Sequence, residues 1–234
     1  MIKMSSSADN HRSRSAAIDI LRAAADSSDR RPAKDNLLAA IVSAQRGGPP
    51  SEQTTFYEAL AGGGSPGRRW KLVYVCGRQA VTAARGGRGS RGRETTGGLL
   101  DPGNFGLLQW FPPVLRSGQF VDGFVTAIQR FDAETMDNEN GIFEILGSDL
   151  VQLTVRGPFK WPQPDCRSVC AFLPNEAIVK LGAWRWNPSL PEPDTPFEDT
   201  KVTKLPFFKF IHVDEKVAVA QGRSGSVALW ARHI

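Results

Sequence analysis

The C-terminal segment 206–232 constrains the fold of this chain more than any other stretch. It consists of three short runs rich in β-branched and aromatic residues, PFFKFIHV, VAVAQG and SVALWAR, separated by DEK and RSG. Runs of this length and composition are typical of strands, and the polar or glycine-containing triplets between them are typical of tight turns. The segment therefore predicts three consecutive antiparallel strands.

Further strands are expected upstream of this segment. The run RRWKLVYVC, 68–76, places Trp70, Leu72, Tyr74 and Cys76 on one face and Val73 and Val75 on the other, so both of its faces are expected to be covered. From 119 to 161 the sequence predicts a meander of long strands, including a hairpin turn at 137–141 because Asn-Gly adopts positive φ at low cost. CRSVCAFL predicts another strand, and a looser stretch follows through Pro196. About eight mostly sequential strands predict a lipocalin-like antiparallel β-barrel in a mainly β, α+β protein.

A helical lead-in is expected before the barrel. Residues 1–14 are polar and lack an apolar period, which predicts a disordered tail. Residues 15–66 carry three short helical patterns, of which the clearest is capped by Asp35 and stopped by the glycines and prolines at 47–50. The barrel is then expected over 67–234, with a flexible arginine- and glycine-rich loop at 77–104.

The composition narrows the classes of partner and compartment. The chain has 234 residues and a net charge of +5, of which Arg85, Arg88, Arg91 and Arg93 supply four charges. A local basic loop explains this excess better than a basic nucleic-acid-binding face. Three cysteines are too few for a disulfide scaffold and fit a reducing compartment. The start of the sequence lacks the apolar region of a secretory signal, and a transit peptide is not clearly visible.

Signatures of catalysis are sparse. The histidines, His11, His212 and His233, have no nucleophile elbow beside them. Cys166 and Cys170 lack the second pair that a zinc site requires, so they are interpreted as buried thiols. We therefore expect no catalytic residue, no metal and no cofactor.

Aromatic residues on the expected strands are the candidate binding residues, because an apolar pocket needs such a lining. The eight candidates are Trp70, Phe124, Phe131, Trp161, Phe172, Phe208, Phe210 and Trp230. For any single one of them, filling the barrel core is the simpler interpretation. Trp184 and Trp186 are candidates for docking on a lipid surface, since Trp favours interfaces. Asp214 and Arg223, which flank the last hairpin, are expected to form an ion pair that fixes the turn, and Arg130 and Asp132 are candidates for the same role.

Several stretches in the right order resemble the plastid lipid-associated protein (fibrillin) family. They are LLAAIVSAQRGGPPSEQ at 37–53, RRWKLVYV at 68–75, AIQRFDAETMDNENGIFEILG at 127–147, LVQLTVRGPFKW at 150–161 and PFFKFIHVDEKVAVAQGRSGSVALWAR at 206–232. The resemblance covers roughly residues 36 to 232, with 77–118 poorly matched.

This resemblance implies a non-catalytic, lipocalin-like protein of plastids, associated with plastoglobules or thylakoid membranes. It also implies binding of isoprenoid quinones, carotenoids or fatty acyl lipids. Three alternatives stay open: a structural lipid-droplet coat protein without an enclosed ligand, a lipocalin-like enzyme acting on a hydrophobic substrate, and an RNA-binding protein using 85–93.

Overall fold

The computed structural model describes residues 5–26, 31–46, 54–64, 66–86, 118–121, 125–132, 137–140, 144–145, 151–160, 168–190 and 195–234. Four α-helices lie in the first part of the chain: α1 (Ser5–Ala25), α2 (Lys34–Arg46), α3 (Thr54–Ala61) and α4 (Arg78–Ala84). Most of the rest is strand: β1 (Arg68–Cys76), β2 (Gln119–Phe120), β3 (Val125–Thr126), β4 (Ile128–Asp132), β5 (Asp137–Asn140), β6 (Glu144–Ile145), β7 (Val151–Lys160), β8 (Val169–Phe172), β9 (Glu176–Leu181), β10 (Trp184–Trp186), β11 (Phe207–Val213), β12 (Val217–Gly222) and β13 (Val227–His233). The mainly β class with a helical lead-in is therefore confirmed.

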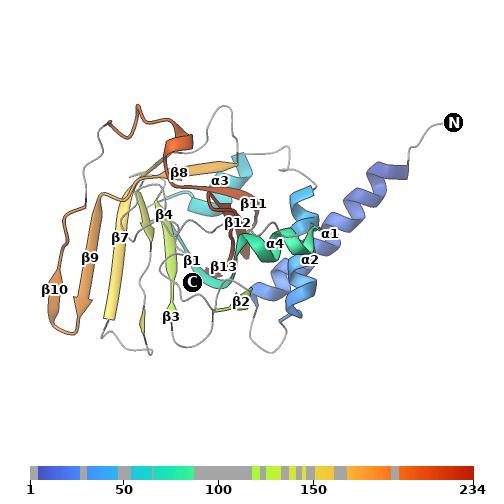
Figure 1. Ribbon diagram of the computed structural model, residues 1–234, viewed down its shortest axis with the longest axis horizontal. Coiled ribbons are helices and arrows are strands. Elements are labelled where there is room, and N and C mark those ends of the chain that lie inside the picture. Colours follow the sequence, from blue (N-terminus) through green and yellow to red (C-terminus); the bar gives the residue numbers. More distant parts are fainter. Residues whose placement is uncertain are drawn as a thin grey trace.

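One antiparallel sheet organises the molecule. Its strand order is β10-β9-β7-β5-β4-β1-β13-β12-β11-β8, with β2 paired to β1, and the short strands β3 and β6 form a separate pair. Figure 1 shows β10, β9 and β7 at one end of the molecule and α1, α2 and α4 at the other. The end of β7 also pairs with β8, through Phe159↔Phe172 and Lys160↔Ala171.

The three C-terminal strands form as the sequence predicts. β11 pairs with β12, and β12 pairs with β13, both antiparallel. β13 then pairs with β1 along nearly the whole of both strands, from Arg69↔His233 to Cys76↔Val227. This places the last strand of the chain beside the first strand of the sheet, so the C-terminal hairpins form the middle of the fold.

The strand β1 is covered on both faces, but the predicted grouping of its side chains is wrong. A register shift lies between Leu72 and Tyr74 in the pairing with β13. Such a bulge reverses the alternation of side chains beyond it. Trp70, Leu72 and Val75 consequently share one buried cluster, whereas Val73, Tyr74 and Cys76 belong to another.

The two clusters divide the core by face. The first cluster, which we call the aromatic cluster, gathers the large rings of β1, β4, β7, β8, β11 and β13. The second cluster packs the opposite face of β1, β12 and β13 against α1, α2 and α4, through residues such as Leu21, Ile41, Val81, Val219 and Leu229. Helices α1, α2 and α4 therefore cover one face of the sheet, whereas the aromatic residues and the end of α3 lie on the other.

Four expectations about segments need correction. Residues 137–140, expected to lie in a hairpin turn, form the strand β5, which pairs with β4 and β7. The helix α1 begins at Ser5 inside the segment expected to be a disordered tail, because Ala17, Leu21 and Ala24 are buried and anchor a helix that continues outward through polar turns. Part of the expected flexible loop 77–104 is the helix α4, whose Val81 is buried; residues 87–104 lie outside the described residues. The stretch expected to be loose before Pro196 contains β9 and β10, and the sheet has eleven strands rather than about eight.

Candidate functional site

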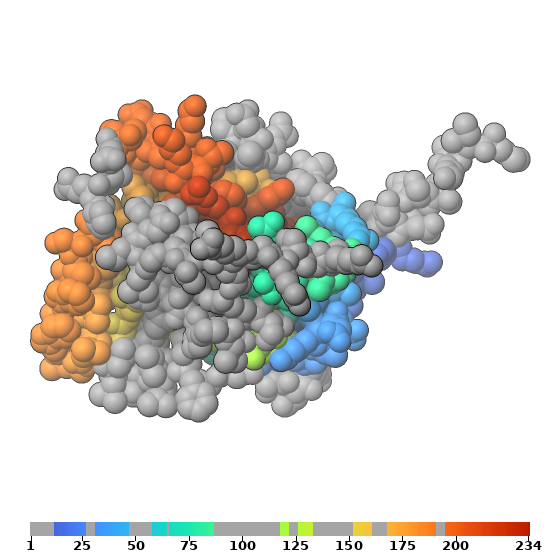
Figure 2. All heavy atoms as spheres, in the orientation of Figure 1, coloured from blue at the N-terminus to red at the C-terminus, as the bar shows by residue number. Residues whose placement is uncertain are grey.

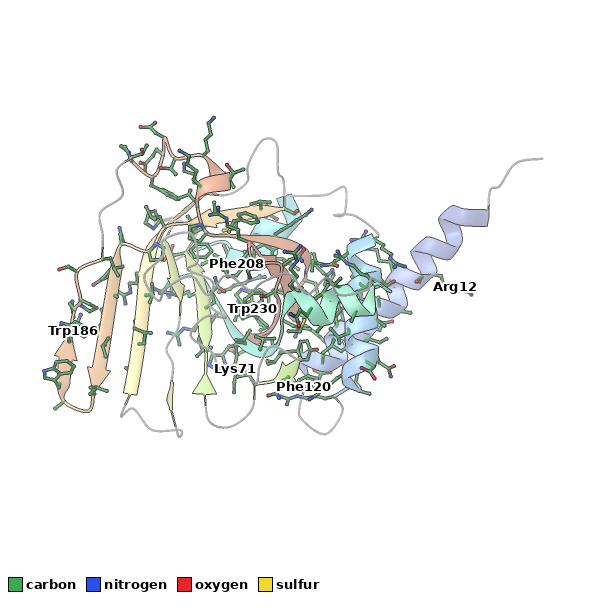
Figure 3. The ribbon with its side chains drawn as sticks, viewed as in Figure 1. Arg12, Lys71, Phe120, Trp186, Phe208 and Trp230 are labelled. Atoms are coloured by element: carbon green, nitrogen blue, oxygen red, sulfur yellow. The ribbon has the colours of Figure 1, made fainter. Side chains whose placement is uncertain are left out.

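Six of the eight candidate aromatic residues come together in the aromatic cluster. Trp70, Phe131, Phe172, Phe208, Phe210 and Trp230 are all buried and all belong to it. Figure 3 shows Phe208 and Trp230 near one another in the middle of the fold. The other two candidates, Phe124 and Trp161, lie outside the described residues.

The rings of these residues pack on one another. The ring of Phe208 is stacked with Phe172 at 5.1 Å between centroids and meets the edge of Trp230 at 5.5 Å. Phe131 contacts Phe159 at 5.7 Å and Phe210 at 6.2 Å, both edge to face. These separations are those of close-packed aromatic pairs. The six residues therefore fill the space between strands, as the simpler interpretation predicts for each of them.

Trp70 also has its polar atom satisfied. Its indole Nε1 donates a 2.7 Å hydrogen bond to the carbonyl oxygen of Leu60 at the end of α3. A buried indole N–H without an acceptor would be costly, so this bond fixes both the ring and the end of the helix. Arg68 reinforces the same junction by donating to the carbonyl oxygen of Ala59 at 2.8 Å.

The predicted ion pair between Asp214 and Arg223 is wrong. Asp214 lies in the turn before β12 and Arg223 in the turn after it, so the length of a six-residue strand, roughly 20 Å, separates them. Asp214 accepts a 2.8 Å hydrogen bond from Nε of Arg22 on α1 and contacts Nε2 of His212 at 2.9 Å. The guanidinium of Arg223 donates instead to the carbonyl oxygen of Lys204.

Asp214 nevertheless fixes its turn. Its Oδ1 accepts hydrogen bonds from the backbone N–H groups of Lys216 and Val217, at 2.8 and 2.9 Å. Partial burial opposes ionisation, but the bonds from His212, from the two N–H groups and from Arg22 outweigh it and lower the pKa of Asp214 far below its usual range. The neighbouring Glu215 pairs with Arg68 at 3.1 Å. This turn thus connects α1 and β1 to the C-terminal hairpin, and no serine, threonine or cysteine among the described residues is hydrogen-bonded to His212.

The large exposed apolar residues of the described chain lie on the β9–β10 hairpin, apart from the terminal Ile234. Trp184 and Trp186 are 53% and 51% exposed, and Leu181 is 47% exposed. The two indole rings stack on each other, with centroids 6.3 Å apart and planes inclined by 24°. Trp186 lies at the extreme end of the sheet, far from the helices (Figure 3). The sequence had indicated these two residues as lipid-docking candidates.

The pairing register connects this hairpin to the aromatic cluster. On β7, Phe159 belongs to the cluster, and Val155 and Leu153 lie on the same face because side chains alternate along a strand. Across the sheet, Val155 pairs with Ala177 and Leu153 with Val179 on β9, and Val179 pairs in turn with Trp186. Leu181 pairs with Trp184 in the same way. We call this continuous surface, Leu153, Val155, Ala177, Val179, Leu181, Trp184 and Trp186, the apolar face.

The opposite side of the same strands carries mostly polar residues, together with Ile178, which pairs with Thr154 and is buried. Gln152 pairs with Lys180, and Lys180 pairs with Arg185. Residues 177–190 contain these two cations and no acidic residue. Figure 2 shows the hairpin, in light orange, at the molecular surface at the end away from the blue helices. The hairpin is therefore amphipathic, with a cationic side and an aromatic side.

Metal and thiol chemistry find no support in the described residues. No group of three or more His, Cys, Asp or Glu side chains among them is placed to hold a metal ion. Cys76 and Cys170 are buried free thiols, as expected for such residues, and Cys166 lies outside the described residues. Burial raises the pKa of the Cys76 thiol to about 12 and raises that of Cys170 as well, which leaves both in the unreactive neutral form. Among the described helices, none has the length and apolarity that crossing a membrane requires.

Comparisons with protein-family models, with curated proteins and with solved structures find no match for this chain.

Proposed function

We propose that this protein is a non-catalytic, lipid-associated protein of the fibrillin type that engages hydrophobic molecules at a lipid surface. The observation that carries the proposal is the apolar face, which runs from the buried aromatic cluster to the exposed, stacked Trp184 and Trp186. Isoprenoid quinones, carotenoids and fatty acyl lipids are the class of ligand, and plastoglobules or thylakoid membranes are the location. The resemblance of the sequence supports this ligand class and location.

The energy of docking follows from the exposed area. Burying the outward halves of two tryptophan side chains removes on the order of 200 Å² of apolar surface from water, worth about 5 kcal/mol. Lys180 and Arg185 lie on the other side of the hairpin and point away from that lipid surface, so each adds less than the value of about 1 kcal/mol for a cation at an anionic surface. The sum corresponds to reversible, peripheral attachment.

A closed eight-stranded barrel is part of the proposal. Pairings lead from β7 through β5, β4, β1, β13, β12, β11 and β8 and return to β7 through Phe159↔Phe172 and Lys160↔Ala171. Gly157 supports the close approach at the seam, because a Cβ there would collide with the carbonyl oxygen of Leu173. β9 and β10 then extend from this ring as an open hairpin that carries the exposed tryptophans.

The test uses sedimentation with liposomes of phosphatidylcholine containing a minor fraction of phosphatidylglycerol. Wild type should partition to the vesicles with a blue shift of tryptophan emission, and the double variant Trp184→Ser/Trp186→Ser should lose on the order of a thousandfold in partitioning, in keeping with about 5 kcal/mol of lost burial. The matched control is Ile234→Ser, which removes an exposed apolar residue elsewhere and should partition like wild type. Equal partitioning of the double variant and wild type would remove the basis of the proposal.

The structural coat protein is the second candidate, and the packing of the aromatic cluster favours it. Rings that contact one another at 5.1 to 6.2 Å leave no room among them for a ligand as large as a carotenoid. Titration with plastoquinone distinguishes the two. Saturable quenching at one ligand per protein supports a carrier, whereas vesicle binding without such uptake supports a coat protein.

A further inference from the structure

A small basic cavity lies away from the apolar face, between the helices and the sheet. It has a volume of about 130 Å³ and is lined by residues at the end of α2, at the end of α4 and on β11 and β12: Ala44, Gln45, Arg85, Lys209, Phe210, Ile211 and Gln221. It shares no residue with the apolar face. The proposed lipid contact therefore gives it no role.

The polar lining of this cavity is cationic. Arg85 and Lys209 supply two positive charges, and none of the residues that line the cavity is acidic. The guanidinium of Arg85 donates one hydrogen bond to the side-chain oxygen of Gln45, which is a neutral partner. The ammonium group of Lys209 has no hydrogen-bonding or ion-pairing partner among the described residues. Two uncompensated cations that face one cavity repel each other, and an anion between them would relieve the repulsion.

The C-terminal ends of α2 and α4 lie at this cavity, but they do not cancel the positive charge of Arg85 and Lys209. C-terminal carbonyl groups normally disfavour an anion. At the end of α4, however, the carbonyl oxygens of Val81 and Thr82 accept the N–H of Arg85, and that of Ala83 accepts the N–H of Gly86. Arg46 lies in the last turn of α2 and offsets its negative end.

The dimensions of the cavity select the size of the anion. Pockets for drug-sized molecules measure about 300–1,000 Å³, so a cavity of about 130 Å³ cannot enclose a whole isoprenoid or a whole nucleotide. The space equals the volume of about four water molecules, which suits one phosphate group. A phosphate monoester carries a charge of about −1.5 to −2 at neutral pH and so matches two cations better than a single carboxylate does.

We propose that the cavity between α2, α4, β11 and β12 is a phosphate-binding site in which Arg85 and Lys209 hold the anion. Arg85 would contact the phosphate oxygens in its planar fork geometry, and Lys209 would act as a flexible point charge. The amides of Gln45 and Gln221 complete the polar rim. Gln221 already donates its Nε2 to the carbonyl oxygen of Gly225 at 3.0 Å, which holds its side chain in place.

The experiment measures binding of inorganic phosphate to the full chain by isothermal titration at low, constant ionic strength. Saturable binding is expected for wild type, and Lys209→Met and Arg85→Met should each weaken it about tenfold or more, because charge-assisted bonds are lost. Lys201→Met is the matched control, since it removes an exposed cation outside the cavity and should leave binding unchanged. Both cavity residues are exposed, so circular dichroism should show wild-type folding for their variants.

A second arm identifies the source of the phosphate. Short-chain phosphatidic acid below its micelle concentration is titrated in parallel with inorganic phosphate. Binding that is at least tenfold tighter for the lipid assigns the site to a lipid headgroup, and equal binding assigns it to free phosphate. Absence of saturable phosphate binding, or wild-type affinity in Lys209→Met, would overturn the proposal and would leave the vesicle test of the tryptophan hairpin unaffected.

Discussion

Asp214 links the N-terminal helix α1 to the C-terminal hairpin. Its carboxylate receives bonds from Arg22, His212 and two backbone N–H groups. Because the folded-state pKa of Asp214 is lowered, its stabilisation is fully present above the unfolded pKa of about 3.9 and is lost as the pH falls toward the folded pKa.

The substitution Asp214→Asn is therefore expected to lower the free energy of unfolding by about 1–3 kcal/mol at pH 7. It should also flatten the loss of stability that wild type shows from roughly pH 5 to pH 2. Urea denaturation across this pH range measures both effects. Asp199→Asn, which changes an exposed carboxylate, should reproduce the wild-type profile. An unchanged pH slope in Asp214→Asn would show that these bonds do not determine the acid sensitivity.

The sequence predicted correctly which aromatic residues are buried. It did not predict which side chains share a face of β1 or which residues pair with Asp214 and Arg223. Six aromatic residues on expected strands are buried together because burial of large apolar rings is favourable. The bulge between Leu72 and Tyr74 has no signal in the local sequence, since LVYVC at 72–76 is a continuous apolar run in which every residue suits either face. The partners of Asp214 and Arg223 likewise depend on which elements pack beside each turn.

At the scale of elements, helix α1 illustrates the same limit. Its C-terminal half carries small and aliphatic residues at helical spacing, but the polar residues before them conceal the helix that begins at Ser5. The hairpin of β9 and β10 escaped detection because the alternation Trp184-Arg185-Trp186 is only three residues long, too short to predict a strand. The two-residue turn at Gly182 and Ala183, with Gly182 at φ +59°, was the available signal.

The substitution Leu21→Ala tests how much the packing of α1 contributes to the stability of the fold. The residue is fully buried against α2 and the helix-covered face of the sheet. Leu21→Ala should cost about 2–5 kcal/mol and leave a cavity beneath the helix. Hydrogen exchange should accelerate first in α1 and α2, and Ser15→Ala, at an exposed position on the same helix, should exchange like wild type. Uniform acceleration across the sheet would instead mean that α1 does not open separately.

At the scale of the whole molecule, the seam between β7 and β8 decides whether the sheet behaves as a ring. The segment 195–206 lies over this seam on its outer side. Phe197 and Leu205 pack on Ala171 of β8, and Lys160 of β7 holds the same segment. The ammonium group of Lys160 donates to the carbonyl oxygens of Glu198 and Thr200, at 2.7 and 3.2 Å, and lies 4.6 Å from the centre of the Phe197 ring.

Lys160→Met keeps the length of the side chain and removes its charge, so the expected result separates a ring from an open sheet. Loss of two charge-assisted bonds and a cation–π contact should cost about 2–4 kcal/mol. In a closed ring β8 is an interior strand, and the cost should appear as a lower midpoint of a single cooperative unfolding transition, with accelerated exchange in β8, β11 and β7 together. In an open sheet β8 is an edge, and only its own amides should exchange faster while the global transition stays where it is in wild type. Lys201→Met, at an exposed position in the same segment, is the control for the loss of one surface charge.

Because the aromatic cluster spans β7, β8 and β11, a ring that opens at this seam also exposes Phe159, Phe172 and Phe208. A dye that binds apolar surface should therefore report the opening at denaturant concentrations below the main transition.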